Sequence, residues 1–255
     1  MKKKINIDFE VFLDNALRSH GYLFPETDTQ MEVYERSVEL KELPSKFQTA
    51  SFVFNYKASA ASTRHCTDVQ RAIVAGHIIN KCNTEDFGRV KFQKLLYLVE
   101  HVFQLDFNSN YERKAAGPHD CSLLKSIEGT LQRYNFYKIP QDSQNNKRVH
   151  YIPLSSATDL SDYFHDHFAS EENSINLFLD KFKNLAWEQC EIVATLYAVW
   201  NNRIIRGQEI SDLLLKQDFL AWDSNKAKYE TRIDGALKWM KQKNIIPTGW
   251  GKIII

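Results

Sequence analysis

Histidine is the residue type that most readily suggests chemistry in this chain, which contains eight of them. The tightest cluster is His165-Asp166-His167, but residues two positions apart on a helix point in different directions. The sequence contains neither an H-E-x-x-H motif nor a ladder of cysteine and histidine ligands. This pattern favours exposed histidines over a metal site, and we expect neither a bound metal nor a cofactor.

The cysteines and the motif search also argue against catalysis. The four cysteines form no C-x-x-C pair, which speaks against a zinc ribbon, a thioredoxin-type site and a disulfide framework. No G-x-S-x-G turn, P-loop or dinucleotide-binding pattern occurs. We therefore expect reduced thiols and no catalytic residue, although a hydrolase assembled from residues distant in the sequence stays open.

The composition is that of a globular protein and gives no sign of nucleic-acid or membrane binding. With 43% apolar and 25% charged residues, the chain resembles an ordinary soluble globular protein. Its formal net charge of +1 provides no global electrostatic reason to bind nucleic acid or an anionic membrane. The N-terminus has acidic residues where a secretory signal needs an apolar stretch, and no run reaches transmembrane length. The sequence predicts a cytoplasmic protein without membrane contact.

The hydrophobic periodicity predicts a mainly α-helical protein in three segments, 1–64, 65–158 and 159–255. The first segment has two short helical patterns, then the strand-like SFVFN and a polar linker. The second contains one helix near 69–79, a strongly amphipathic helix that begins after Gly88, and a third over SLLKSIEGTLQRYNFY. Its polar stretch QDSQNNKR, between KIP and VHYIPL, predicts a small β-hairpin.

The third segment predicts a winged-helix-like end. A helix begins near Ser161, and helical patterns follow in WEQCEIVATLYAVWNNRII, in ISDLLL and over Tyr229–Met240. Two strand-like runs at 245–247 and 252–255 then flank a glycine-rich turn, and three helices followed by a hairpin is the order of a winged helix. Basic side chains beside such a wing would meet phosphate groups of DNA. The candidate nucleic-acid contacts are Lys226, Lys228, Arg232, Lys238, Lys241, Lys243 and Trp250.

The helix FGRVKFQKLLYLVEHVF, Phe87–Phe103, followed by Gly117-Pro118 in ERKAAGPHD, resembles the opening of the Panacea domain, also called the SocA-like domain. The similarity covers about residues 70–155. Ala115-Ala116 and His119-Asp120 replace the aromatic residue, lysine and valine that many family members carry around Gly-Pro. The resemblance implies a mainly helical protein that acts by stoichiometric binding. It would be a bacterial antitoxin or adaptor, and its partner a toxin or defence-system subunit encoded nearby.

In this interpretation, the central helix and the Gly-Pro loop form the scaffold of a partner-binding surface. Charged side chains on the polar side of the helix would face solvent or the partner, whereas Tyr97 is more typical of a core residue. Glycine and proline would reshape the chain before the next helix. The candidate partner contacts are Arg89, Lys91, Gln93, Lys94, Tyr97, Gly117, Pro118 and His119.

A second resemblance supports an alternative. The region from Phe87 onward, including WEQCEIVATLYAVWNN, is similar to an accessory C-terminal region of proteins labelled as type I restriction specificity subunits. The N-terminal HGYLFPETD is similar to leader regions of bacterial toxin-antitoxin and defence loci. The alternative function is therefore a DNA-associated accessory module of a restriction-modification or related defence system.

Overall fold

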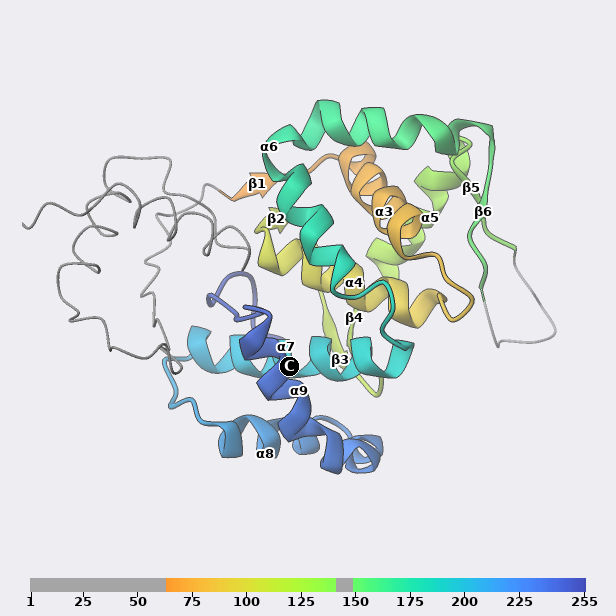
Figure 1. Cartoon of the computed structure of the whole chain (residues 1–255). Coiled ribbons are helices and arrows are strands. Elements are labelled where there is room, and N and C mark those ends of the chain that lie inside the picture. The colour runs from red at the N-terminus through yellow and green to blue at the C-terminus, as the bar shows by residue number, and fades with distance from the viewer. Residues whose placement is uncertain (1–62, 141–148) are drawn as a thin grey trace, which may run out of the picture. The chain divides into compact units, whose positions relative to one another are not determined.

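Two helices, α3 (Asp68–Cys82) and α4 (Arg89–Val102), form the centre of the described structure. The computed structural model describes residues 63–140 and 149–255, which belong to a single compact unit (Figure 1). Helix α3 starts at a capping box, in which the Thr67 hydroxyl accepts from the Gln70 amide and the Gln70 side chain accepts from the Thr67 amide. Helix α4 follows Gly88, as the spacing of its apolar residues predicted.

Helix α4 lies between two groups of helices. On one side, α3 packs against α5 (Cys121–Arg133) and α6 (Leu160–Asp180), and on the other, α4 packs against α7 (Trp187–Ile205), as Figure 1 shows. A 3-10 helix, η1 (Ser155–Asp159), leads into α6. Helices from both sides of the predicted boundary at 158/159 therefore share one hydrophobic core.

Short strands join the helices in three two-stranded sheets. The strand pairs are β1 (Arg64–His65) with β2 (Leu105–Asp106), parallel; β3 (Glu112–Lys114) with β4 (Gly117–His119), antiparallel; and β5 (Tyr137–Lys138) with β6 (Ile152–Pro153), antiparallel. The last pair confirms the hairpin predicted around QDSQNNKR, although residues 141–148 lie outside the described residues. The helices and the strand predicted before residue 63 also lie outside them.

The helices predicted for the last third of the chain are confirmed. After α7 come α8 (Asp212–Trp222), the 3-10 helix η2 (Ser224–Tyr229) and α9 (Glu230–Gln242), and α8 begins at the N-cap Ser211. Helix α7 packs against both α8 and α9. None of the helices in the described ranges is long and apolar enough to span a membrane.

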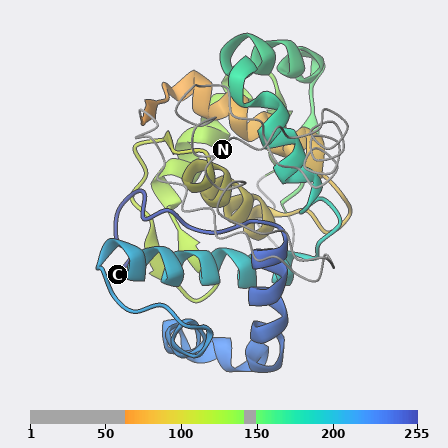
Figure 2. The same ribbon diagram turned by 60° about the vertical axis from the view of Figure 1, so that its left-hand side comes forward.

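The predicted β-hairpin at the C-terminal end is wrong, because residues 243–255, here called the C-terminal segment, contain no β-strand. Figure 2 shows this segment leaving α9 and running back alongside α7. Its backbone groups bond to side chains of α7 instead of to a partner strand: Asn202 Nδ2 donates to the Ile254 carbonyl at 2.8 Å, and Asn202 Oδ1 accepts from the Ile254 amide at 3.0 Å. Asparagine side chains thus satisfy the groups that a hairpin would have paired.

Candidate functional site

The polar side chains of α4 that sequence analysis assigned to an exposed surface are inside the protein. Lys91, Gln93 and Lys94 are buried, and Tyr97 is fully buried. The prediction assumed that charged side chains stay in water, but α3, α7 and β4 enclose both the apolar and the polar side of this helix. The predicted surface is therefore wrong for these three polar residues, whereas the interpretation of Tyr97 as core is confirmed.

The buried polar side chains of α4 have internal partners. Lys91 Nζ lies 3.2 Å from Asp86 Oδ1 and donates to the Lys183 carbonyl at 3.2 Å. Gln93 Oε1 lies 2.7 Å from His119 Nδ1. Of the predicted contacts on α4, Arg89 remains exposed, but its guanidinium binds both carboxyl oxygens of Glu128, at 2.7 and 2.8 Å. These residues hold elements together and do not form one open surface.

The Gly-Pro pair lies in strand β4, not in a loop at the start of a helix. Gly117 adopts a φ of +93°, and both Gly117 and Pro118 are buried. The Pro118 carbonyl accepts a hydrogen bond of 2.6 Å from Lys94 Nζ. Helix α5 begins three residues later, where the Asp120 carboxylate caps the Leu123 amide. The pair therefore brings a carbonyl oxygen to a buried lysine.

Lys94→Met is expected to flatten the pH dependence of stability between pH 7 and pH 9. Burial lowers the Lys94 pKa from 10.5 to about 7, so the unfolded chain binds more protons than the folded chain in this window. The contribution of Lys94 is complete above its unfolded pKa and is lost as the pH falls toward 7. The difference in proton binding at Lys94 changes the free energy of unfolding by at most about 1.4 kcal/mol per pH unit.

The measurement is urea denaturation of both proteins at pH 7, 8 and 9. The window stops at pH 9 because burial raises the pKa of Cys82 and Cys66 to about 11. At higher pH a raised thiol pKa makes the free energy of unfolding fall as the pH rises, which opposes the effect of Lys94. Buried Lys226 and half-buried Lys181 also have lowered pKa values and are present in both proteins, so the difference reports Lys94. Equal slopes for the two proteins would contradict a depressed Lys94 pKa.

The basic residues predicted to contact DNA do not form one exposed basic surface. Lys226 is fully buried, which contradicts its assignment to phosphate contact. Arg232 pairs with Glu188 at 3.0 Å and Lys241 with Asp212 at 2.5 Å. The remaining members of the set, Lys228, Lys238 and Lys243, are exposed. Trp250 is not at the tip of a wing: it lines a cavity next to α4.

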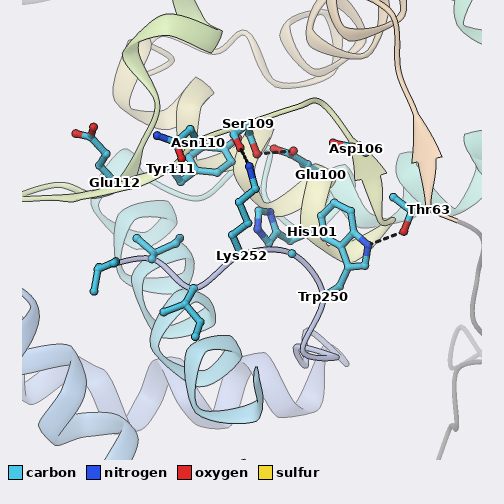
Figure 3. Close-up of a pocket in the computed structure, with 14 residues that line it drawn as sticks. Thr63, Glu100, His101, Asp106, Ser109, Asn110, Tyr111, Glu112, Trp250 and Lys252 are labelled. Carbon is cyan, nitrogen blue, oxygen red and sulfur yellow. Dashed lines mark hydrogen bonds between the residues drawn. The ribbon is translucent and has the colours of Figure 1, made fainter. Parts of the chain in front are cut away.

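That cavity is the candidate functional site. It has a volume of about 460 Å³ and lies between the end of α4, the loop from β2 to β3 and the C-terminal segment. Figure 3 shows Trp250 directed toward Thr63, and Lys252 extending across the cavity toward Ser109. Trp250 Nε1 donates to Thr63 Oγ1 at 3.2 Å, and Lys252 Nζ donates to the Ser109 carbonyl at 3.3 Å.

A buried carboxyl group lines the cavity. Glu100 Oε1 accepts from Ser109 Oγ at 2.7 Å and from the Phe107 amide at 3.2 Å. Glu100 Oε2 makes no hydrogen bond of normal geometry within the described residues, although the Tyr111 hydroxyl lies close enough to the carboxyl group to help lower its pKa. Burial raises the Glu100 pKa to about 7, against the lowering effect of these bonds. The group is therefore close to half-protonated at neutral pH.

The next residue of α4, His101, presents a free acceptor to the same cavity. Its Nδ1 donates to the Tyr97 carbonyl at 3.0 Å, so Nδ1 carries the proton and Nε2 has a lone pair. Burial lowers the His101 pKa to about 3, which keeps the ring neutral. The Trp250 ring meets it edge-on, with 5.3 Å between centroids.

Two tyrosines complete this polar cluster. The hydroxyls of Tyr97 and Tyr111 are buried, and neither makes a hydrogen bond of normal geometry to a described residue, although the Tyr111 hydroxyl lies near the Glu100 carboxyl group. The two rings pack nearly at right angles, with centroids 4.9 Å apart. Each unpaired buried polar group costs about 1–3 kcal/mol. Such groups gathered at a cavity, next to a carboxyl with a strongly shifted pKa, indicate a functional site.

Sequence reasoning missed this cluster. Glu100 and His101 follow each other in LVEHVF, where they resemble the polar edge of an amphipathic helix. The wall formed by residues 250–255 comes from far away along the chain, so no local spacing indicated the cavity. The one available signal was the glycine-rich turn around Trp250, which the winged-helix interpretation had assigned to a hairpin.

Removing the side chain of Asn202 is expected to loosen the wall formed by the C-terminal segment. Asn202→Ala deletes two buried hydrogen bonds to Ile254 and should cost about 1–3 kcal/mol. The amides of residues 249–255 should then exchange with deuterium faster, as followed by mass spectrometry. Asn173→Ala, at an exposed position of α6, is the matched control and should leave exchange unchanged. Unchanged exchange in Asn202→Ala would contradict the tether.

The histidines of the His165-Asp166-His167 cluster are exposed, as the sequence predicted. His165 is exposed and its Nδ1 lies 2.7 Å from Glu172 Oε2, which raises the His165 pKa. Among residues 63–140 and 149–255, no group of three histidine, cysteine or acidic side chains is arranged to hold a metal ion. Cys82 and Cys190 are buried, Cys66 is half-buried and Cys121 is exposed.

Fold and cavity together define a mainly α-helical protein with a polar cavity between its central helix and its C-terminal segment. No protein-family model, curated protein or solved structure matches the chain. The Panacea-like and restriction-subunit-like interpretations therefore stay predictions from the residues quoted above.

Proposed function

We propose that this protein acts by stoichiometric binding of a protein partner, as a bacterial antitoxin or adaptor, and not as an enzyme. The observation that carries the proposal is a patch formed by three exposed side chains, Tyr134, Ile152 and Tyr163, here called the hairpin patch. Their exposed fractions are 44%, 44% and 45%. They come from the end of α5, from β6 and from the first turn of α6.

Phe136 links the members of the hairpin patch: both tyrosine rings contact its ring, and Ile152 lies in the strand next to it. The Tyr134 ring stacks on Phe136 with centroids 6.0 Å apart, and the Tyr163 ring meets Phe136 at 6.1 Å. Ile152 lies in β6, two residues before Leu154, whose amide donates to the Phe136 carbonyl at 2.9 Å. Single exposed apolar side chains are normal, whereas adjacent aromatic and aliphatic ones are typical of protein interfaces.

The test is coexpression of the full chain with each adjacent open reading frame, scoring both rescue of growth and co-purification. A toxic neighbour should be neutralised and retained. The double variant Ile152→Ser with Tyr163→Ser should weaken retention about tenfold or more, since interface aromatic residues often contribute over 1 kcal/mol each. Leu177→Ser is the control, because Leu177 is 51% exposed near the other end of α6. Failure of every neighbour to co-purify would reject the proposal.

The alternative is a DNA-associated accessory module of a type I restriction or related defence system. Such a module would use α7, α8 and α9 with the exposed Lys228, Lys238 and Lys243. Phosphate contacts weaken as salt rises, so DNA retention with a steep salt dependence would favour this alternative. Undetectable or salt-insensitive retention would reject it.

A further inference from the structure

The cavity beside α4 has an excess of hydrogen-bond acceptors and of negative charge. Three carboxyl groups line it, those of Glu100, Asp106 and Glu112, against one ammonium group, that of Lys252. Asp106 pairs with His65 at 2.5 Å and Glu112 with Lys114 at 2.7 Å, and both basic partners are exposed, so Glu100 is the lining carboxyl group without a basic partner among the described residues. The Lys252 ammonium group donates to the Ser109 carbonyl at 3.3 Å.

Two buried acceptors provide independent support. Glu100 is 1% exposed, and among the described residues its Oε2 has no donor in normal hydrogen-bond geometry; the Tyr111 hydroxyl is the nearby group that could turn toward it or toward a ligand. His101 is also buried, and its Nε2 receives no hydrogen bond from the described residues. The C-terminal segment passes close to this nitrogen, since a Cβ added at Gly251 would lie 3.1 Å from it. A ligand that carries several N–H groups would supply the donors that both atoms lack.

We propose that this cavity binds the ammonium or guanidinium group of an organic cation. The Glu100 carboxylate is the counter-charge, His101 Nε2 accepts a second hydrogen bond, and the Trp250 and Tyr111 rings form aromatic walls that favour a cation. The ligand is either a free amine or a lysine or arginine side chain of a polypeptide. The site shares no residue with the hairpin patch, so the proposal does not depend on the proposed function.

Binding should strengthen as the pH rises from 6 to 8, because the cation selects the ionised form of Glu100. Below the Glu100 pKa of about 7 the affinity should rise up to about tenfold per pH unit, and it should level off above that pKa. His101 stays neutral throughout this range. The other titratable or charged groups that face Glu100 are Asp106, Tyr111, Cys66, Tyr97 and Lys252.

The test is calorimetric titration of the full chain with Nα-acetyl-arginine amide and with agmatine, at pH 6, 7 and 8. Nα-acetyl-citrulline amide, an uncharged analogue of nearly equal shape, is the control ligand. Saturable binding of either cation, but not of the citrulline compound, supports the proposal. Tighter binding of the amide assigns the site to a polypeptide side chain, and tighter binding of agmatine assigns it to a free amine. Equal binding of citrulline, or no binding at millimolar concentration, overturns it.

Two variants with opposite expected effects make the test specific. Glu100→Gln keeps an oxygen for Ser109 and Phe107 but removes the charge, and should weaken binding about tenfold or more and abolish its pH dependence. Lys252→Met removes the competing ammonium and should strengthen binding. Glu230→Gln, exposed at the start of α9, should change nothing. If Glu100→Gln fails to fold, a pH-independent affinity of the unmodified protein still overturns the proposal.

Discussion

Lys226→Met is expected to lower the free energy of unfolding by about 3–5 kcal/mol, because it leaves a buried carboxylate without its counter-charge. Lys226 Nζ donates to Glu191 Oε1 at 2.7 Å and to Thr195 Oγ1 at 3.2 Å. The two paired side chains are only 0% and 5% exposed. Water therefore cannot replace the missing ammonium group, and Glu191 must stay charged at a high desolvation cost or take up a proton.

A double-mutant cycle tests this interpretation by chemical denaturation. Replacing both partners, with Lys226→Met and Glu191→Leu, should restore most of the lost stability, since a buried pair can often be exchanged for apolar side chains. The matched control is Lys216→Met: Lys216 pairs with Asp234 at 3.0 Å, but Asp234 is largely exposed. That change should cost no more than about 1 kcal/mol. A cost at Lys226 equal to that at Lys216 would contradict the burial of the pair.

Gly117→Ala should cost about 3 kcal/mol or more, for two physical reasons that act together. A Cβ at this position would lie 2.5 Å from Thr195 Oγ1, and a φ of +93° is strained for any residue with a side chain. Thr195 cannot easily move, because its hydroxyl donates to the Glu191 carbonyl at 2.8 Å and accepts from Lys226. Overpacking of a fixed neighbour is itself worth about 1–3 kcal/mol.

Gly129→Ala is the matched control for Gly117→Ala. Gly129 lies within helix α5, and no heavy atom of the surrounding described residues would lie within 4 Å of an added Cβ. Alanine is the better helix former, so this variant should gain up to about 1 kcal/mol. Thermal denaturation of both variants gives the comparison. Two variants with the same stability would contradict the assigned role of Gly117 in the contact between β4 and α7.

Local signals in the sequence were sufficient for most helices. The spacing of apolar residues placed α4 after Gly88, and the capping residues of α3 lie within a few positions of the helix that they start. The hairpin of β5 and β6 was predictable for the same reason, because two short runs flank one polar stretch. Helix and turn preferences depend on near neighbours in the chain, which is the information that a single sequence contains.

The environment of α4 could not be predicted in this way. Lysines such as Lys91 and Lys94 normally mark the exposed side of a helix. Here they are buried because α7 and β4 cover that side of α4. The Lys91 ammonium group is tolerated in the interior because the nearby Asp86 carboxylate and the distant Lys183 carbonyl bind it. Lys94 donates to the distant Pro118 carbonyl, and burial lowers its pKa to about 7. No periodicity in α4 itself contains this information.

Local sequence patterns were enough to predict the helical class of the protein, the approximate positions of α3 to α9 and the hairpin of β5 and β6, since each depends on spacing within a few residues. The tertiary structure alone decided the course of the C-terminal segment: its isoleucine runs resemble strands, but Asn201 and Asn202 of α7 bind its backbone. It also decided the candidate site, where Glu100 and His101 meet Trp250. Burial from several sides at once sets their charge states, and burial is a property of the packed chain, not of any local pattern.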